Sequence, residues 1–180
     1  MFDKEYSFSG KHADYVKALT SNPFSDDSKQ RGVFLRNVDV FMIAPFVGVL
    51  NNRKSLQDSI NSKSTTKIFT DQLTSRLYEL NYILMTVVLN DRDINDSQER
   101  IENAFKKLFE DQYKEELYKK FNEYLLGGVE VLFEKIIQGA VSFDDILSNF
   151  NLFVEDFNTI HSNSTYQRQS IFDQDELKIN

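Results

Sequence analysis

The sequence predicts an all-α protein, a helical bundle of five to seven helices. Three observations support this class. Apolar residues recur three and four positions apart along most of the chain. Only 6 Gly and 2 Pro occur in 180 residues, too few for a turn-dense β fold. The composition is 41% hydrophobic and 27% charged, which excludes wholesale disorder. We expect one helical domain over residues 1–160 and a loose polar tail over 161–180, either disordered or partner-binding.

The N-terminal part contains one short predicted helix. Residues 1–10 are expected to be a loose lead-in, and residues 12–20 have the apolar spacing of a helix. Asn22-Pro23 should stop that helix, because proline disfavours helical backbone at the residue before it. The polar stretch 25–32 then forms a loop.

Residues 33–51 are the most apolar stretch and the predicted centre of the core. Their spacing favours a helix, although clustered β-branched residues leave a strand open over 38–43. Pro45 lacks a backbone donor, so a kink or break is expected near it. Gly48 either permits close approach of another backbone or weakens the helix.

Residues 66–160 contain the strongest helical patterns. After a polar stretch over 51–66, with a helical turn possible near Leu56, a long apolar seam predicts a helix from Thr66 to Leu89. A further helix, capped by Asp96 and Glu99, should reach Leu125 and end at Gly127-Gly128. A short helix over 129–138 and a last helix over 142–160, capped by Ser142 and Asp145, complete the bundle.

The net charge of −7 is unevenly distributed. Residues 1–90 carry 11 Lys/Arg and 9 Asp/Glu, whereas residues 91–180 carry 10 and 19. Acidity of the second half disfavours nonspecific nucleic-acid binding but leaves one basic surface possible over residues 28–76. Its candidate partner- or anion-binding residues are Arg31, Arg36, Asp39, Arg53 and Lys54. Arg36 and Asp39 share a helix face and can pair, so a solvated surface explains this set as well.

One loop has a weak resemblance to a calcium-binding EF-hand. Asp91, Asp93, Asn95 and Glu102 take the spacing of loop positions one, three, five and twelve. Asp96 stands where the turn requires glycine, so an acidic helix cap is the favoured interpretation and no metal is expected.

Nothing in the sequence selects a catalytic group. The two histidines, His12 and His161, lie at predicted helix ends, where ordinary structural roles explain them. Nucleophile-elbow, metalloprotease, phosphate-loop and dinucleotide motifs are missing, so neither a catalytic residue nor a cofactor is predicted. An enzyme of unfamiliar type is left open.

Compartment and membrane contact are judged from composition. The chain has no Cys, its polar N-terminus does not look like a secretory signal, and the longest apolar run is Val40–Leu50. Since that run is shorter than the roughly 20 residues of a membrane span, we expect a cytoplasmic protein without a membrane partner.

Two functions follow as hypotheses. The first is a non-catalytic protein-interaction module or small subunit of a larger cytosolic assembly, forming a homodimer through apolar seams that one chain leaves exposed. The alternative is a nucleic-acid-associated accessory factor, of a phage or genome-defence type, that uses the basic surface of residues 28–76.

Overall fold

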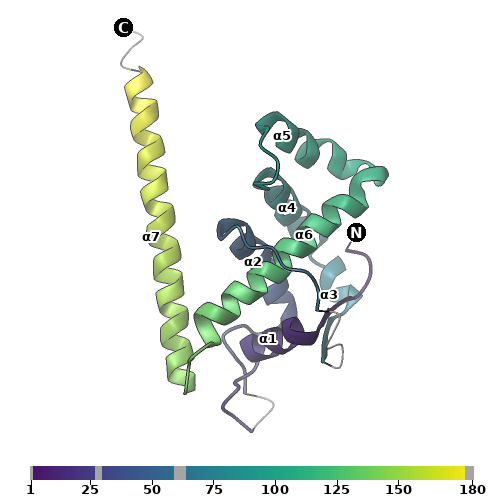
Figure 1. The fold of residues 1–180 in the computed structure, drawn as a ribbon, viewed down its shortest axis with the longest axis vertical. Helices are drawn as coiled ribbons and strands as arrows, with labels where there is room; N and C mark the ends of the chain where they lie inside the picture. The colour runs from purple at the N-terminus through teal and green to yellow at the C-terminus, as the bar shows by residue number, and fades with distance from the viewer. Residues whose placement is uncertain (1, 27–29, 59–63, 177–180) are drawn as a thin grey trace.

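The computed structural model describes residues 2–26, 30–58 and 64–176, with only the backbone described at Phe109 and at 160–176. Within these residues the chain is mostly helical, as predicted, with a two-stranded sheet beside the helices (Figure 1). None of the helices described is both long and apolar enough to cross a membrane. The helices are α1 (Gly10–Thr20), α2 (Asn37–Leu50), α3 (Thr70–Thr74), α4 (Leu77–Leu89), α5 (Ser97–Phe105), α6 (Asp111–Leu132) and α7 (Phe143–Glu176).

The sheet was not predicted from the sequence. Strands β1 (Tyr6–Ser9) and β2 (Thr65–Ile68) pair antiparallel, with Tyr6 opposite Ile68. Tyr6, Phe8 and Ile68 are buried, because alternate residues of a strand face the same side. The expectation of a loose lead-in over residues 1–10 was therefore wrong. Its aromatic side chains complete a core around Phe41 and Phe121, where Phe2 also packs.

Helix α2 confirms the helical alternative over the strand at residues 38–43. It begins at Asn37, four residues later than the apolar pattern suggested, and continues past Pro45 to Leu50 without a break. The carbonyl of Phe41 loses its intrahelical donor at Pro45, but the surrounding apolar residues are buried and hold the helix in place.

Helices α2 and α6 cross with their backbones almost in contact. A Cβ atom added to Gly48 would lie 2.1 Å from the Tyr124 carbonyl oxygen, and one added to Gly128 would lie 1.7 Å from that of Ala44. A Cβ atom added to Gly127 would likewise lie 2.1 Å from the Arg53 carbonyl oxygen. The prediction that Gly127-Gly128 ends a helix was wrong, because both lie inside α6, where the lack of a side chain permits the crossing.

The long seam from Thr66 is divided between β2, α3 and α4. Thr74 and Ser75 turn their hydroxyl groups back onto carbonyls of α3, at 2.9 Å to Thr70 and 3.1 Å to Gln72. Such bonds compete with the continuing helix, which ends there and restarts at Leu77. The apolar spacing remains valid within α4, where Leu80, Leu84 and Val87 are buried.

The helices predicted over 97–125 and 129–138 are also divided differently. α5 ends at Phe105, the 3₁₀ turn η1 (Lys107–Phe109) follows, and α6 continues through the glycines into the π-helical turn η2 (Phe133–Ile137). Two of the predicted cap residues accept a backbone bond: Asp96 from the Gln98 N–H at 2.8 Å and Ser142 from the Asp145 N–H at 3.2 Å.

Helix α7 is longer than predicted and projects from the body. It was expected to end near Ile160, but it continues to Glu176, and its last part stands clear of the other helices (Figure 1). Its base is attached to η2, where Asn149 donates to the Ile136 carbonyl at 3.2 Å, and to Phe34 through an edge-to-face contact with Phe150. The binding role suggested for residues 161–180 stays a prediction.

We predict that Gly128→Ala destabilises the protein by more than about 3 kcal/mol, beyond most overpacking substitutions. The added methyl group meets a backbone carbonyl at 1.7 Å and has no rotamer by which to escape. Gly139→Ala is the control, since its Cβ meets nothing within 4 Å and only its φ of +83° is unfavourable. That strain should cost about 1–2 kcal/mol. Urea unfolding followed by circular dichroism measures both, and equal losses would contradict a constraint at the crossing.

Candidate functional site

Charged and polar residues from several elements gather in two clusters around α6 and the segment after α2. We call them the Glu130 cluster and the Asp91 cluster, after the buried carboxylate at each centre. The Glu130 cluster comprises Lys11, His12, Arg53, Ser55, Glu130 and Glu134. The Asp91 cluster comprises Lys54, Asp91, Asp93, Lys120 and Tyr124.

Glu130 is almost buried, at 5% exposure, and hydrogen-bond donors surround its carboxylate. Its Oε1 accepts from Ser55 Oγ at 2.6 Å and Lys11 Nζ at 2.8 Å, and its Oε2 accepts from Arg53 at 3.1 Å. Burial alone would raise the pKa of Glu130, but the hydrogen bonds from Lys11, Ser55 and Arg53 outweigh it and lower the pKa to about 2. Glu130 is therefore ionised at neutral pH and ties α1, α6 and the segment after α2 together.

His12 lies fully buried beside this carboxylate. Its Nε2 is 3.2 Å from Glu130 Oε1, so the neutral tautomer with the proton on Nε2 can donate to the carboxylate. Burial lowers the pKa of His12, and the charge of Glu130 only partly opposes that effect. His12 lies in the first turn of α1 rather than before the helix, and it contacts Glu130 of α6. His161 lies where side chains are not described.

The Asp91 cluster has the same construction. Asp91 is fully buried, and its Oδ1 accepts from Lys54 Nζ at 2.9 Å and from the Tyr124 hydroxyl at 3.0 Å. Lys120 Nζ lies 3.1 Å from Oδ2. Burial would raise the pKa of Asp91, but the bonds from Lys54, Lys120 and Tyr124 lower it to about 2. Lys54 also contacts Asp93 and sits 4.6 Å from the centre of the Tyr124 ring.

The EF-hand-like residues do not converge on one point. Asp91 and Asp93 both contact the ammonium group of Lys54, whereas Glu102 lies on α5 and contacts Lys106 at 3.5 Å. Asn95 lies in the loop between them. Over the ranges that the structure describes, no three His, Cys, Asp or Glu side chains are grouped to hold a metal ion.

The proposed anion-binding residues are divided between two places. Arg36 precedes α2 and pairs with Asp39 at 3.0 Å, as the sequence suggested, while Arg31 forms a backbone bridge with Ser21. Arg53 and Lys54 follow the other end of α2 and face the two buried carboxylates. The 14 residues of α2 span about 21 Å, so Arg36 and Arg53 do not share one site.

Sequence reasoning missed the Glu130 cluster, although one signal was present. Glu130 is the only charged residue between Tyr124 and Leu132 in an otherwise apolar run. A carboxylate in such a run needs a buried partner, because an unpaired buried charge is very costly. The identity of that partner could not be inferred from the sequence, because Arg53 lies 77 positions away.

These observations define a small, mostly helical protein whose buried charges hold its elements together. Its family is shown by the sequence: the profile of DNA sulphur modification system-associated protein 4 matches residues 8–172, and the chain belongs to that family. No curated protein and no solved structure matches it.

We predict that Glu130→Gln lowers the free energy of unfolding by about 2–3 kcal/mol. This is below the roughly 3–5 kcal/mol of a fully buried pair, since Lys11 and Arg53 keep 47% of their side-chain surface exposed. Glu134→Gln is the matched control, because Glu134 contacts the same Arg53 nitrogen at 3.1 Å but is 44% exposed. It should cost under about 1 kcal/mol. Equal effects in urea unfolding would contradict the structural role of Glu130.

We also predict that acid weakens the fold through Glu130 and Asp91. In the unfolded chain these carboxyls titrate near 4.5 and 3.8, but in the fold both pKa values are about 2. The unfolded state therefore binds protons first, and stability falls as the pH drops from about 5 to about 2. His12, whose pKa is lowered from 6.5, adds a loss that begins below its unfolded value.

Urea unfolding at a series of pH values measures this dependence. Glu130→Gln and Asp91→Asn should each flatten the slope between about pH 5 and pH 2. A wild-type stability that is constant over that interval would contradict the assignment.

Proposed function

We propose that this protein is a non-catalytic accessory component of a DNA sulphur modification system and acts by binding another protein of that system. The observation that carries the proposal is the family match over residues 8–172, which includes the helical body and most of α7. The family name indicates the DNA sulphur modification system. The arrangement of charged residues supports a binding role rather than a catalytic one.

The absence of catalysis is supported by the geometry of the Glu130 cluster. Ser55, His12 and a glutamate are the residue types of a hydrolase triad, but here both Ser55 and His12 contact the same Glu130 oxygen. A triad instead needs the histidine between the serine and the carboxylate, so that it can take the hydroxyl proton. His12 is moreover fully buried, which keeps it away from any substrate.

A protein partner is favoured over DNA because many basic side chains are already neutralised. Arg36, Arg53, Lys54 and Lys67 each contact a carboxylate of the same chain. With a net charge of −7, the chain as a whole would be repelled by a phosphate backbone.

Direct DNA contact is the second candidate, favoured by one observation. Arg36 has a half-exposed side chain at the start of α2, close along the chain to Arg31 and distant from the buried clusters. Phosphate contacts from these residues would account for a place in a system that modifies DNA.

The two candidates differ in their response to salt. Purified chain is mixed in turn with each purified protein of the modification system and with duplex DNA, and complexes are measured by light scattering after size exclusion. We expect a complex with one protein that persists when salt rises from about 50 to 200 mM, whereas DNA binding through two phosphate contacts would weaken about tenfold over that range. Arg31→Ala with Arg36→Ala should leave it intact. A DNA complex lost in salt and in that variant, with no protein complex, would overturn the proposal.

A further inference from the structure

An apolar groove separates α7 from α2 and the end of α4. Its volume is about 400 Å³, and five phenylalanines are among its lining residues. Helix α2 contributes Ile43, Phe46 and Leu50, and α7 contributes Phe150, Val154 and Phe157. Several of these are open to solvent, including Ile43 at 44% and Val154 at 39% exposure. The cost of leaving such surface in water indicates that something covers it.

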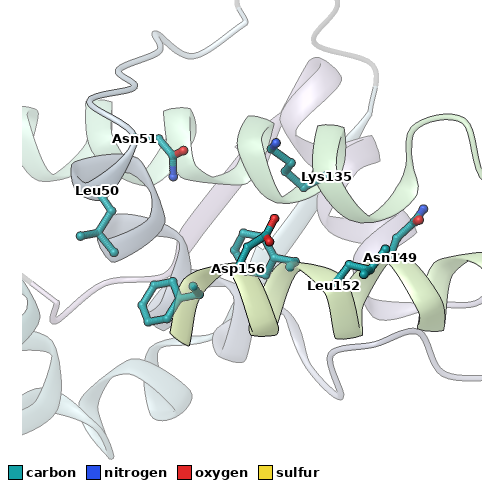
Figure 2. Close-up of a pocket in the computed structure, with 8 residues that line it drawn as sticks. Leu50, Asn51, Lys135, Asn149, Leu152 and Asp156 are labelled. Carbon is teal, nitrogen blue, oxygen red and sulfur yellow. The ribbon is translucent and has the colours of Figure 1, made fainter. Parts of the chain in front are cut away.

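A second cavity of about 250 Å³ lies beside the groove, along a neighbouring face of α7. Figure 2 shows Leu50 and Asn51 from the end of α2, Lys135 from η2, and Asp156 from α7 around it. Phe153 and Phe157 line both cavities, so α7 contacts the body here only along a narrow strip. The α7 side of the groove is therefore held against the other helices by few contacts.

The charges around the groove indicate what can enter it. Its described lining contains no Asp, Glu, Lys or Arg, so the inserted face must be apolar and uncharged. Between residues 143 and 159, α7 carries four carboxylates (Asp144, Asp145, Glu155 and Asp156) and no Lys or Arg. Two copies that packed through α7 would bring these like charges together, which argues against self-association at this face.

We propose that this groove binds an amphipathic helix of a partner protein, with an apolar stripe between α2 and α7 and Lys or Arg along its edges. The inference rests on the proposed function and names the chemistry of its protein partner. The lining runs over about two turns on each helix, from Ile43 to Leu50 and from Phe150 to Phe157. Apolar anchors spaced i, i+3, i+4 and i+7 on one helix match that length. Basic edges complement the acidic α7.

The test uses a fluorescent designed peptide of about 14 residues, roughly four helical turns, with Leu at those positions and Lys elsewhere. The first comparison peptide replaces every Lys by Glu, and the second scrambles the sequence and so removes the stripe. Affinity is measured by fluorescence anisotropy with the full chain. Methyl NMR spectra report where the peptide binds, because Ile43, Val47 and Val154 line the groove whereas Leu147 does not.

We expect the Lys peptide to bind and to shift the groove methyl signals while the Leu147 signal stays. Ile43→Gln and Val154→Gln should each weaken binding about tenfold. Leu147→Gln is the matched control: Leu147 is exposed on the same helix to a similar 41%, and its replacement should change affinity by less than about twofold.

Four outcomes would overturn the proposal. If the Glu peptide bound as tightly as the Lys peptide, the basic charges would play no part in recognition. If the scrambled peptide did so, the apolar stripe would play none. Equal effects of Val154→Gln and Leu147→Gln would indicate nonspecific attraction to an acidic protein. A chain that is a dimer in light scattering and becomes a monomer on Val154→Gln would assign the groove to a second copy.

The proposed function is tested separately with the purified proteins of the modification system. If one of them still bound both groove variants, the proposed function would stand and its binding site would lie outside the groove.

Discussion

The close crossing of α2 and α6 is the constraint on which the rest of the fold depends. Gly48 and Gly128 let the two backbones approach to distances that no side chain would allow, and Gly127 opens a third such contact to the segment after α2. The buried faces of both helices then meet at the crossing, and the aromatic core from the N-terminal strand packs against Phe41 and Phe121. A larger residue at the crossing would separate the helices and open that core as well as the crossing.

The same crossing positions the buried charges. The Arg53 backbone lies against Gly127, and successive side chains of an extended segment point to opposite sides. Arg53 therefore reaches Glu130 on one side, and Lys54 reaches Asp91 on the other. Each carboxylate is almost or fully buried and surrounded by several donors, which is the condition under which a buried charge stabilises a particular arrangement. Two neighbouring residues thus fix the register of α6 against α1 and against the loop after α4.

The helical class, the caps at Asp96 and Ser142 and the burial of the α2 region were predictable from the sequence, because they depend on local spacing and local hydrogen bonds. Gly127 and Gly128 led to a wrong helix end, because glycine both ends helices and permits close helix crossings. The sequence alone does not show the partner helix that decides between these roles. The sheet was missed because each strand has four residues and is stabilised by a partner 56 to 62 positions away. The charge clusters are equally nonlocal, and for that reason Arg53 and Lys54 after α2 looked available for a ligand.

Helix α7 differs physically from this body. Outside α7, the two buried carboxylates Glu130 and Asp91 are paired with basic side chains. Between residues 143 and 159, α7 carries carboxylates but no Lys or Arg, and apolar side chains such as Val154 are exposed beside the groove. The substitutions that test the body and those that test the groove can therefore be separated, because exposed positions such as Val154 carry little of the folding energy. In the proposed complex, the acidity that disfavours direct DNA contact would also favour a basic partner at α7. The proposed role through another protein of the modification system is consistent with this charge distribution, which would repel DNA and attract a basic partner.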